Sequence, residues 1–293
     1  MTDETAVQQI RRTGVNWGTT TTVIIFHFAA IAALFMFTWP ALAAFVVLTL
    51  VAGAPGIGIG YHRLLTHRGF KTPKFVEYLL TVCGMLSLQS GAINWVATHR
   101  IHHAHTDGPG DPHTPRDGTW WAHMGWIFTG TAQQHEESVL RRYAPDLMKD
   151  PVHRFLNRWF FMPLVITGAL LLAFGGWPLV FWGVFLRVTV AWHVTWLVNS
   201  ATHIWGTRRF ETTDDSTNNW LVAFLTYGEG WHNNHHAHPR SARHGLAWYE
   251  FDLNWVLIRG MQMVGLATDI KLTKLQEPAA GSGDAANALR EAA

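Results

Sequence analysis

Four long stretches of the chain are apolar and nearly free of charge. The first has 19 residues without Asp, Glu, Lys or Arg, close to the roughly 20 that a helix needs to cross a bilayer core. Short turns at Trp39-Pro40 and Gly175-Gly176-Trp177-Pro178 join the stretches in pairs, and Arg187 is the only formal charge in the second pair. We therefore expect four membrane-spanning helices in two hairpins, at residues 21–39, 41–61, 160–176 and 179–205.

The segment from Lys74 to Val96 is less apolar than these four stretches. It carries Glu77, Gln89 and Asn94, which favours a helix that is interfacial or partly buried. The alternative is a fifth span, but an odd number of spans would separate the two histidine-rich regions onto opposite faces of the membrane. We therefore expect the interfacial helix.

Lys and Arg residues predict the orientation in the membrane. Both short turns lack them, whereas the N-terminus, the segment from Arg63 to Arg158 and the C-terminal third hold nearly all, which places these regions in the cytoplasm. We expect a multi-pass protein of a bacterial plasma membrane with both termini inside. Its predicted parts are a cytoplasmic segment (1–20), one domain (21–276) with cytoplasmic regions 62–159 and 206–276, and a disordered tail (277–293).

Composition supports contact with lipid. Charged residues make up 14% of the chain against a usual figure of about 25%, and the chain has 16 Trp and 17 Phe. The net charge of +2 gives no reason to expect a nucleic-acid partner. Cys83 is the single cysteine, which excludes an intramolecular disulfide and a zinc or iron–sulfur site built from cysteines.

Two histidine motifs have the spacing of ligands on one helical face. His99-Arg100-Ile101-His102-His103 and His232-Asn233-Asn234-His235-His236 each place imidazoles at positions i, i+3 and i+4. Each motif can therefore direct three ring nitrogens toward one region.

Two further pairs lie at the cytoplasmic ends of predicted spans. His62 and His67 are five residues apart, which on a regular α-helix leaves them about 140° from a common face, so we expect the second span to unwind or bend there. Asn199 and His203, at i and i+4, end the fourth span.

Nine imidazoles exceed what one ion can bind. Imidazole nitrogen suits Zn, Cu, Fe and Ni, so ligand type alone does not select the metal. Two ions with four or five nitrogens each would use all nine. The chain has no cysteine set and no H-E-x-x-H motif, which argues against structural or protease zinc. A redox pair open to dioxygen is the natural inference, although a metal-transport site would produce the same spacings.

The other histidines are expected to have ordinary roles. Isolated histidines are usually packed in a core or exposed on a surface, and the last three of the following lie near the motifs, where they could also support the ligands. They are His27, His123, His135, His153, His193, His244, His105, His113 and His238.

The motifs resemble the three histidine boxes H-x4-H, H-x2-H-H and H-x2-H-H of the membrane fatty acyl desaturases, over about Tyr61 to Ile258. Further segments are similar to the enzymes of that family that insert the first double bond. These segments are Thr66-His67-Arg68-Gly69-Phe70-Lys71, Asp111-Pro112-His113, Asn199-Ser200-Ala201-Thr202-His203, Gly228-Glu229-Gly230-Trp231 and Ser241-Ala242-Arg243-His244-Gly245. His238 and Pro239 depart from the family pattern, which bears on substrate preference.

The resemblance implies a di-iron centre. One iron would be held by His62, His67, His99, His103 and His236, and the other by His102, His203, His232 and His235, with Asn199 reaching it through water. Asp111 and Glu229 are expected to accept hydrogen bonds from metal-bound imidazoles. The implied fold is an all-α integral membrane protein with a cytoplasmic helical cap that holds the metals.

The implied reaction is oxygen-dependent desaturation between carbons 9 and 10 of a saturated acyl chain. A membrane hydroxylase or ketolase is the nearest alternative, and a histidine-rich metal transporter is another. The substrate is expected to be an acyl thioester or a membrane acyl-lipid. Val46 and Leu50 are hypothesised to line the acyl tunnel and set chain length.

The chain has no nucleotide motif, cysteine set or fused haem domain that could supply electrons, so an external donor is implied: a ferredoxin, haem cytochrome or flavoprotein reductase. Candidate residues for docking it, or for binding an anionic head group, are Arg141, Arg142, Arg208 and Arg209.

Overall fold

The computed structural model describes residues 14–130 and 134–273, and this part of the chain is helical with isolated β-bridges and no strand. The expectation of an all-α fold is confirmed for these residues. The predicted tail from Glu277 onward lies outside them. The helices, with η marking 3₁₀- and π-helices, are α2 (Trp17–Ala33), α3 (Trp39–Val51), η1 (Ala52–Thr66), α4 (Lys74–Met85), α5 (Ala92–His105), η2 (Pro115–Asp117), α6 (Thr119–His123), η3 (Gly125–Phe128), α7 (Glu137–Tyr143), α8 (Pro145–Lys149), α9 (Pro151–Arg158), α10 (Met162–Val180), η4 (Phe181–Leu186), α11 (Arg187–Asn199), η5 (Ala201–His203), α12 (Trp220–Leu225), α13 (His232–Ala237) and α14 (Leu253–Met263).

Two helical runs in the described residues are long and apolar enough to cross a membrane. The first joins α3 and η1 from Trp39 to Thr66, and the second joins α10, η4, α11 and η5 from Met162 to His203. Helix α2 is also apolar but is shorter, with 17 residues. The first run continues to Thr66, past the predicted end at Tyr61, because Ala52–Thr66 stays helical as a π-helix through Pro55.

The second run turns back on itself at Gly176. This glycine has φ 70° and ψ −165°, a conformation that a residue with a Cβ rarely adopts. Before and after the turn the chain packs side by side, since a Cβ placed on Gly183 would lie 2.7 Å from the side chain of Leu171. The turn lies within the predicted segment from Gly175 to Pro178.

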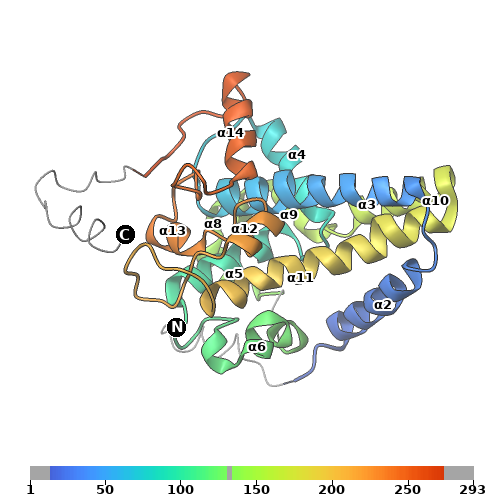
Figure 1. Cartoon of the computed structure of the whole chain (residues 1–293), viewed down its shortest axis with the longest axis horizontal. Coiled ribbons are helices and arrows are strands. Elements are labelled where there is room, and N and C mark those ends of the chain that lie inside the picture. The colour runs from blue at the N-terminus through green and yellow to red at the C-terminus, as the bar shows by residue number, and fades with distance from the viewer. Residues whose placement is uncertain (1–13, 131–133, 274–293) are drawn as a thin grey trace, which may run out of the picture.

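Helix α2 packs mainly on η4 and α11. Trp182 Nε1 donates a hydrogen bond to the Ala33 carbonyl at 2.8 Å, and Thr189 Oγ1 donates to the Phe26 carbonyl at 3.2 Å. Figure 1 shows α11 between α2 and α3. Helices α2 and α3 follow one another through a short connection, but α11 lies between them, so each packs on the second long run.

The expected single helix over 74–96 is divided in the structure. Helix α4 ends at Met85, and α5 begins at Ala92 after Leu88 and Ser90, which both have positive φ. Helix α4 lies very close to η1, because a Cβ on Gly56 would be 2.6 Å from the backbone of Cys83. The break lets α5 point its histidines toward the end of η1.

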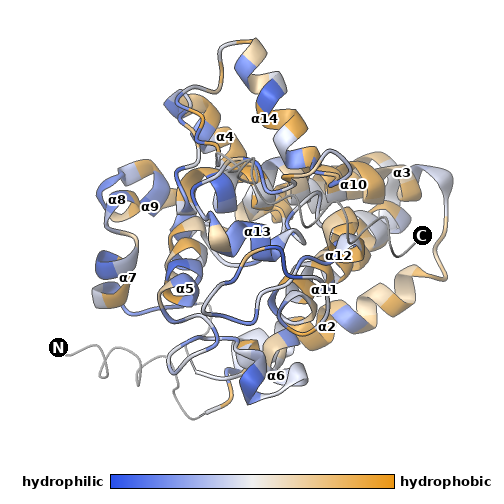
Figure 2. Ribbon diagram, turned by 60° about the vertical axis from the view of Figure 1, so that its left-hand side comes forward, coloured by the Kyte–Doolittle hydropathy of each residue, from blue (hydrophilic) through white to orange (hydrophobic). Residues whose placement is uncertain are grey.

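Apolar and polar residues are separated along the long axis of the molecule. In Figure 2 hydrophobic residues dominate α2, α3 and α10, whereas α5, α7, α9 and α13 carry many hydrophilic ones. Phe28, Phe35 and Phe174 are among the large apolar side chains that the long helices expose. An exposed apolar surface of this extent marks contact with lipid, so the polar end is the region where charged chemistry is accessible to water.

Candidate metal centre

The nine motif histidines, from four helices and the residue that follows η1, gather at the polar end of the long helices. They form two groups, within each of which ring nitrogens lie within 4.8 Å of one another. The five-histidine group contains His62, His67, His99, His103 and His235. The four-histidine group contains His102, His203, His232 and His236.

The π-helix explains how His62 and His67 come to face the same point. In a π-helix the repeating hydrogen bond joins residues five apart, and here the His67 N–H donates to the His62 carbonyl at 3.1 Å. Five residues then complete approximately one turn, so both imidazoles lie on one side. The expected departure from regular α-helix is therefore a change of helix type.

Helices α5 and α13 each supply both groups in the same way. On α5 the i, i+4 pair His99 and His103 stays together, and His102 turns to the four-histidine group. On α13 the pair His232 and His236 stays together, and His235 turns to the five-histidine group. The implied division was therefore wrong for His235 and His236, which exchange places, because residues four apart are stacked on one helical face.

The Nε2 atoms of each group point toward each other. In the five-histidine group, His62 Nε2 lies 3.2 Å from His235 Nε2, which lies 3.0 Å from His103 Nε2. In the four-histidine group, His232 Nε2 lies 3.1 Å from His203 Nε2 and 3.0 Å from His236 Nε2. Contacts this short between ring nitrogens need a proton or a cation between them.

Carboxylates determine which ring nitrogen carries the proton. The Nδ1 atoms of four histidines donate to carboxylates, which leaves a lone pair on each Nε2. One hydrogen on His232 Nε2 could satisfy only one of its two Nε2 neighbours, and His102 Nε2 is buried without a hydrogen-bond partner in the described residues. A cation in each group would satisfy all these lone pairs. The donor pairs are His62 with Glu229, His102 with Asp111, His203 with Asp107 and His236 with Asp214.

The environment also favours the neutral form of six of the nine imidazoles, the form in which they can bind a metal. Burial is the largest cause, and neighbouring imidazoles add to it. Together they lower the pKa well below its ordinary value for His67, His99, His103, His232, His235 and His236. The donor set, its neutrality and its unsatisfied lone pairs fit two transition-metal ions.

Glu229 joins the five-histidine group to a second buried network. Besides His62, it contacts Arg63 Nη2 at 2.9 Å and lies 3.3 Å from His244 Nδ1. Burial alone would raise the pKa of Glu229, but Arg63 and His62 hold it well below its usual range. Arg63 also binds Asp252 at 2.9 Å, which ties the ligand helix η1 to the segment before α14.

Two of the four carboxylates that bond the imidazoles were predicted from the sequence, and two were not. Asp111 and Glu229 contact imidazoles of the two groups, as expected. Asp107 and Asp214 make the same kind of contact but were not predicted from the sequence. Asp214 is far from the first two motifs in sequence and lies outside the third, so local spacing carried no signal. His244, expected to be an isolated packing residue, contacts Glu229 and the ring of His235.

The remaining histidines lie outside the two groups. His113 is buried beside Asp111, and burial together with His102 lowers its pKa to about 3. His193 bridges His27 and His123, with nitrogen separations of 3.0 Å on each side. His153 binds Glu77 and His135 binds Thr98, while His105 and His238 are partly exposed.

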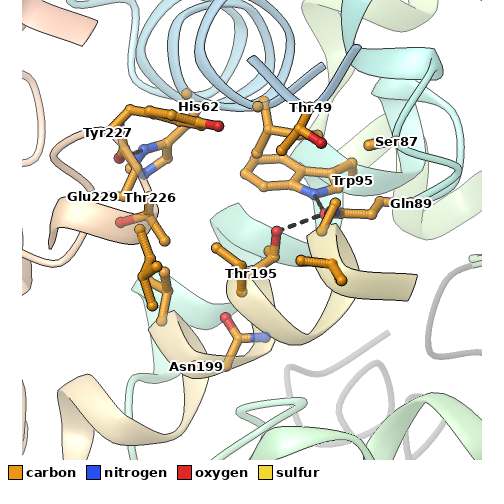
Figure 3. A pocket seen from close by; sticks show the side chains of 18 of the residues that line it. Thr49, His62, Ser87, Gln89, Trp95, Thr195, Asn199, Thr226, Tyr227 and Glu229 are labelled. Atoms are coloured by element: carbon orange, nitrogen blue, oxygen red, sulfur yellow. Dashed lines mark hydrogen bonds and ion pairs between the residues drawn. The ribbon is translucent and has the colours of Figure 1, made fainter. Parts of the chain in front are cut away.

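A narrow, mostly apolar cavity leads to both groups from the side of the long helices. Figure 3 shows His62, Tyr227 and Glu229 on one side of it and Trp95 and Gln89 on the other, with Asn199 on α11 nearby. Its lining from the long helices is Thr49, Gly53, Ile57, Val190 and Val194, and it reaches His62, His99 and His232.

Val46 and Leu50, which were hypothesised to line the acyl tunnel, are not among the residues that line this cavity. Their side chains are 53% and 42% exposed on the outer face of α3. Leu50 is turned about 100° from Thr49 around the helix axis. Thr49 and Gly53 line the cavity instead.

On the opposite side, an open hollow of about 970 Å³ reaches His67, His103 and His236. Its basic side chains are Arg68, Arg100, Arg142 and Arg240. Of the other arginines expected to bind a partner, Arg141 pairs with Glu137, Arg209 with Glu250, and Arg208 bonds Thr212.

Replacing His103 with Ala should reduce the transition metal bound per chain from two ions toward one, because the five-histidine group loses a ligand. His27→Ala is the control, since this histidine of α2 bonds His193 and belongs to none of the groups that could hold a metal. Elemental analysis of purified protein measures the outcome. An unchanged metal content in His103→Ala would contradict ligation by this residue.

Comparisons with known proteins agree with this geometry. The profile of a family described as fatty acid desaturase matches residues 37–266. An sn-1 stearoyl-lipid 9-desaturase of Anabaena variabilis is 46% identical over 88% of this chain and 94% of its own length. An sn-2 palmitoyl-lipid 9-desaturase of Nostoc sp. is 45% identical over 84% and 87%. An acyl-CoA 5-desaturase of Anemone leveillei is 44% identical over 84% and 76%.

Proposed function

Because the chain belongs to the fatty acid desaturase family, we propose that it inserts a cis double bond between carbons 9 and 10 of a saturated acyl chain. The protein is an oxidoreductase, and two relatives with 45–46% identity are named as 9-desaturases of lipids. The observation that carries the proposal is the apolar cavity, which ends at His62, His99 and His232.

The geometry suits oxidation of an unactivated methylene. No acid or base in a protein removes hydrogen from a saturated chain, so an oxidant made from dioxygen is required. We propose that the two histidine groups bind iron, which would supply this chemistry, and that Asn199 holds a metal-bound water. Burial of the chain contributes about 0.8 kcal/mol per methylene, and the apolar lining excludes water from the reacting carbons.

The substrate is proposed to be the acyl group of a membrane lipid. The relatives from Anabaena and Nostoc are named for stearoyl-lipid and palmitoyl-lipid substrates, whereas the Anemone relative is named for acyl-CoA. The apolar surface of the long helices supports delivery of the chain from the bilayer.

We propose four spans, formed by α2, by α3 with η1, by α10, and by η4 with α11, beneath a cytoplasmic cap. The reversal at Gly176 and the clustering of Lys and Arg near the opposite end support this topology.

Expression in cells that lack their own desaturase tests the function directly. We expect a new fatty acid with a double bond at carbon 9, located by gas chromatography and mass spectrometry. His62→Ala should abolish it, because the five-histidine group loses a ligand next to the cavity. A hydroxylated chain without an alkene would instead favour the hydroxylase alternative.

The lining of the cavity predicts which substitutions change chain length. Thr49→Phe should fill the cavity and move the products toward shorter chains, whereas Val46→Phe, on the exposed face of the same helix, should leave the profile unchanged. The chain-length distribution of unsaturated products is the measurement. The reverse pattern would restore the original hypothesis for Val46.

Topology can be tested with introduced cysteines in a Cys83→Ser background. Trp177→Cys, at the turn, should react with a membrane-impermeant maleimide added to intact cells. Arg142→Cys, in the cap, should react only after lysis. Labelling of both positions from outside would refute the proposed orientation.

We further propose that an acidic electron carrier docks at the open hollow. Arg68 and Arg240 line it beside His67 and His236, on the side away from the acyl cavity, so a donor would not displace the substrate. Arg240→Glu should raise the KM for the donor several-fold and leave the KM for the acyl substrate unchanged. Arg259→Glu on α14 is the control, and equal effects of the two variants would exclude this docking site.

A further inference from the structure

Negative charge is distributed unequally behind the two histidine groups. Three of the four imidazoles of the four-histidine group donate Nδ1–H to an aspartate, whereas one of the five imidazoles of the five-histidine group donates to a carboxylate. The group with fewer histidines thus has more carboxylates.

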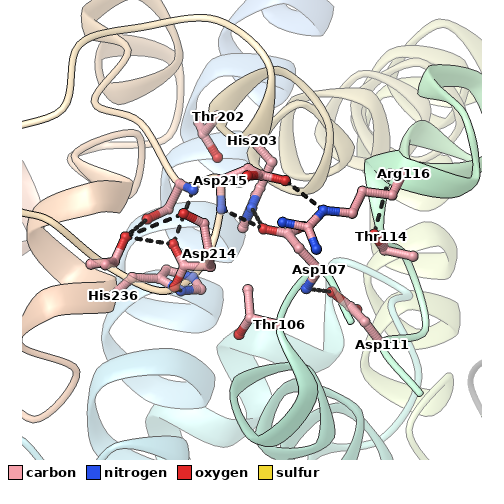
Figure 4. A network of polar contacts seen from close by, with 12 residues as sticks. Thr106, Asp107, Asp111, Thr114, Arg116, Thr202, His203, Asp214, Asp215 and His236 are labelled. Atoms are coloured by element: carbon pink, nitrogen blue, oxygen red, sulfur yellow. Dashed lines mark hydrogen bonds and ion pairs between the residues drawn. The ribbon is translucent and has the colours of Figure 1, made fainter. Parts of the chain in front are cut away.

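The three aspartates are held in place by backbone donors and lie close together in the fold. Asp107 accepts from His203 at 2.9 Å and from the Asp215 N–H at 2.8 Å. Asp111 accepts from His102 at 3.0 Å and from the Asp107 N–H at 2.8 Å. Figure 4 shows Asp107 between His203 and the loop that carries Asp214 and Asp215.

Asp214 completes this set from the neighbouring loop. One of its oxygens accepts from His236 at 3.0 Å, and the other accepts from the Ser216 N–H at 3.0 Å. These bonds fix the carboxylate against the imidazole and add no positive side chain.

No lysine or arginine pairs with these aspartates in the described part of the chain. The ion pairs of Asp107, Asp111 and Asp214 are all with imidazoles. Arg116, the nearby cation in Figure 4, binds the exposed Asp215 at 2.8 Å. Because all three aspartates are buried, solvent screens their charges only weakly.

The single carboxylate of the five-histidine group is bonded to an arginine. Glu229 is bound by the buried guanidinium of Arg63 at 2.9 Å and also accepts from Asn254 at 2.7 Å. Asp252, the other partner of Arg63, contacts none of the nine histidines. One group therefore has three aspartates directly behind its ligands with no arginine bonded to them, although Arg116 acts on Asp107 and Asp214 at longer range. The other group has one carboxylate, which is bonded to an arginine.

We propose that this asymmetry makes the two metal positions unequal in redox potential. The inference rests on the proposed function. Asp107, Asp111 and Asp214 stabilise a trivalent over a divalent ion, so they lower the potential at the four-histidine position below that at the five-histidine position. When the reduced pair is oxidised one electron at a time, the four-histidine position changes from M²⁺ to M³⁺ first. One electron passes to the oxidant, and no bond or proton is transferred.

A potentiometric titration of the iron-loaded full-length protein with redox mediators tests this. Ferric iron is followed by electron paramagnetic resonance and Mössbauer spectroscopy, and metal content is measured for each variant. The wild type should show two one-electron waves. Asp107→Asn and Asp214→Asn should each raise the lower potential and leave the upper one in place, and Asp214→Glu should restore it because the charge is retained.

Asp150→Asn is the matched control. Asp150 caps α9 and binds Lys74 away from both groups, and Asn also serves as an N-cap, so neither wave should move. Should Asp107→Asn lose metal, Asp214→Asn, which lies in a different loop, decides the question.

A single wave from protein that holds two irons, or a shift of the upper wave in the Asp107 and Asp214 variants, would overturn the asymmetry and leave the proposed function intact. Wild-type protein that takes up no iron would instead refute the proposed function.

Discussion

Nine imidazoles turn the same ring nitrogen toward two small regions, and lone pairs at this separation repel each other unless positive charge lies between them. The carboxylates behind His62, His102, His203 and His236 remove the choice of tautomer, because they hold the proton on Nδ1. The arrangement suits a set of metal ligands, and the helices of the polar end bring these nitrogens together.

The fold meets this requirement by directing helices from different parts of the chain to one place. The π-helix η1 aligns His62 with His67, and α5 and α13 each divide three histidines between the groups. The same helices form the walls of the apolar cavity and of the open hollow. The proposed acyl substrate and the proposed electron carrier would therefore approach the centre from opposite sides without competing for space.

Much of the centre was predictable, because metal ligation imposes spacings that survive in sequence. The motifs identified all nine histidines that the structure gathers, and uncharged runs located the long helices. The break before α5 was not predicted, because it depends on the positive φ of Leu88 and Ser90. The packing of α2 and the lining of the cavity depend on which side of an apolar helix faces its neighbour, and a helix such as α3, apolar on every side, carries no such information. Asp107 and Asp214 contact their histidines through the tertiary fold, so no local sequence pattern predicts these contacts.

The most direct test of the account is anomalous scattering at the iron absorption edge from crystals of the iron-loaded protein. The account predicts two strong peaks, one among the Nε2 atoms of the five-histidine group and one among those of the four-histidine group. A single peak, or peaks away from these nitrogens, would contradict it.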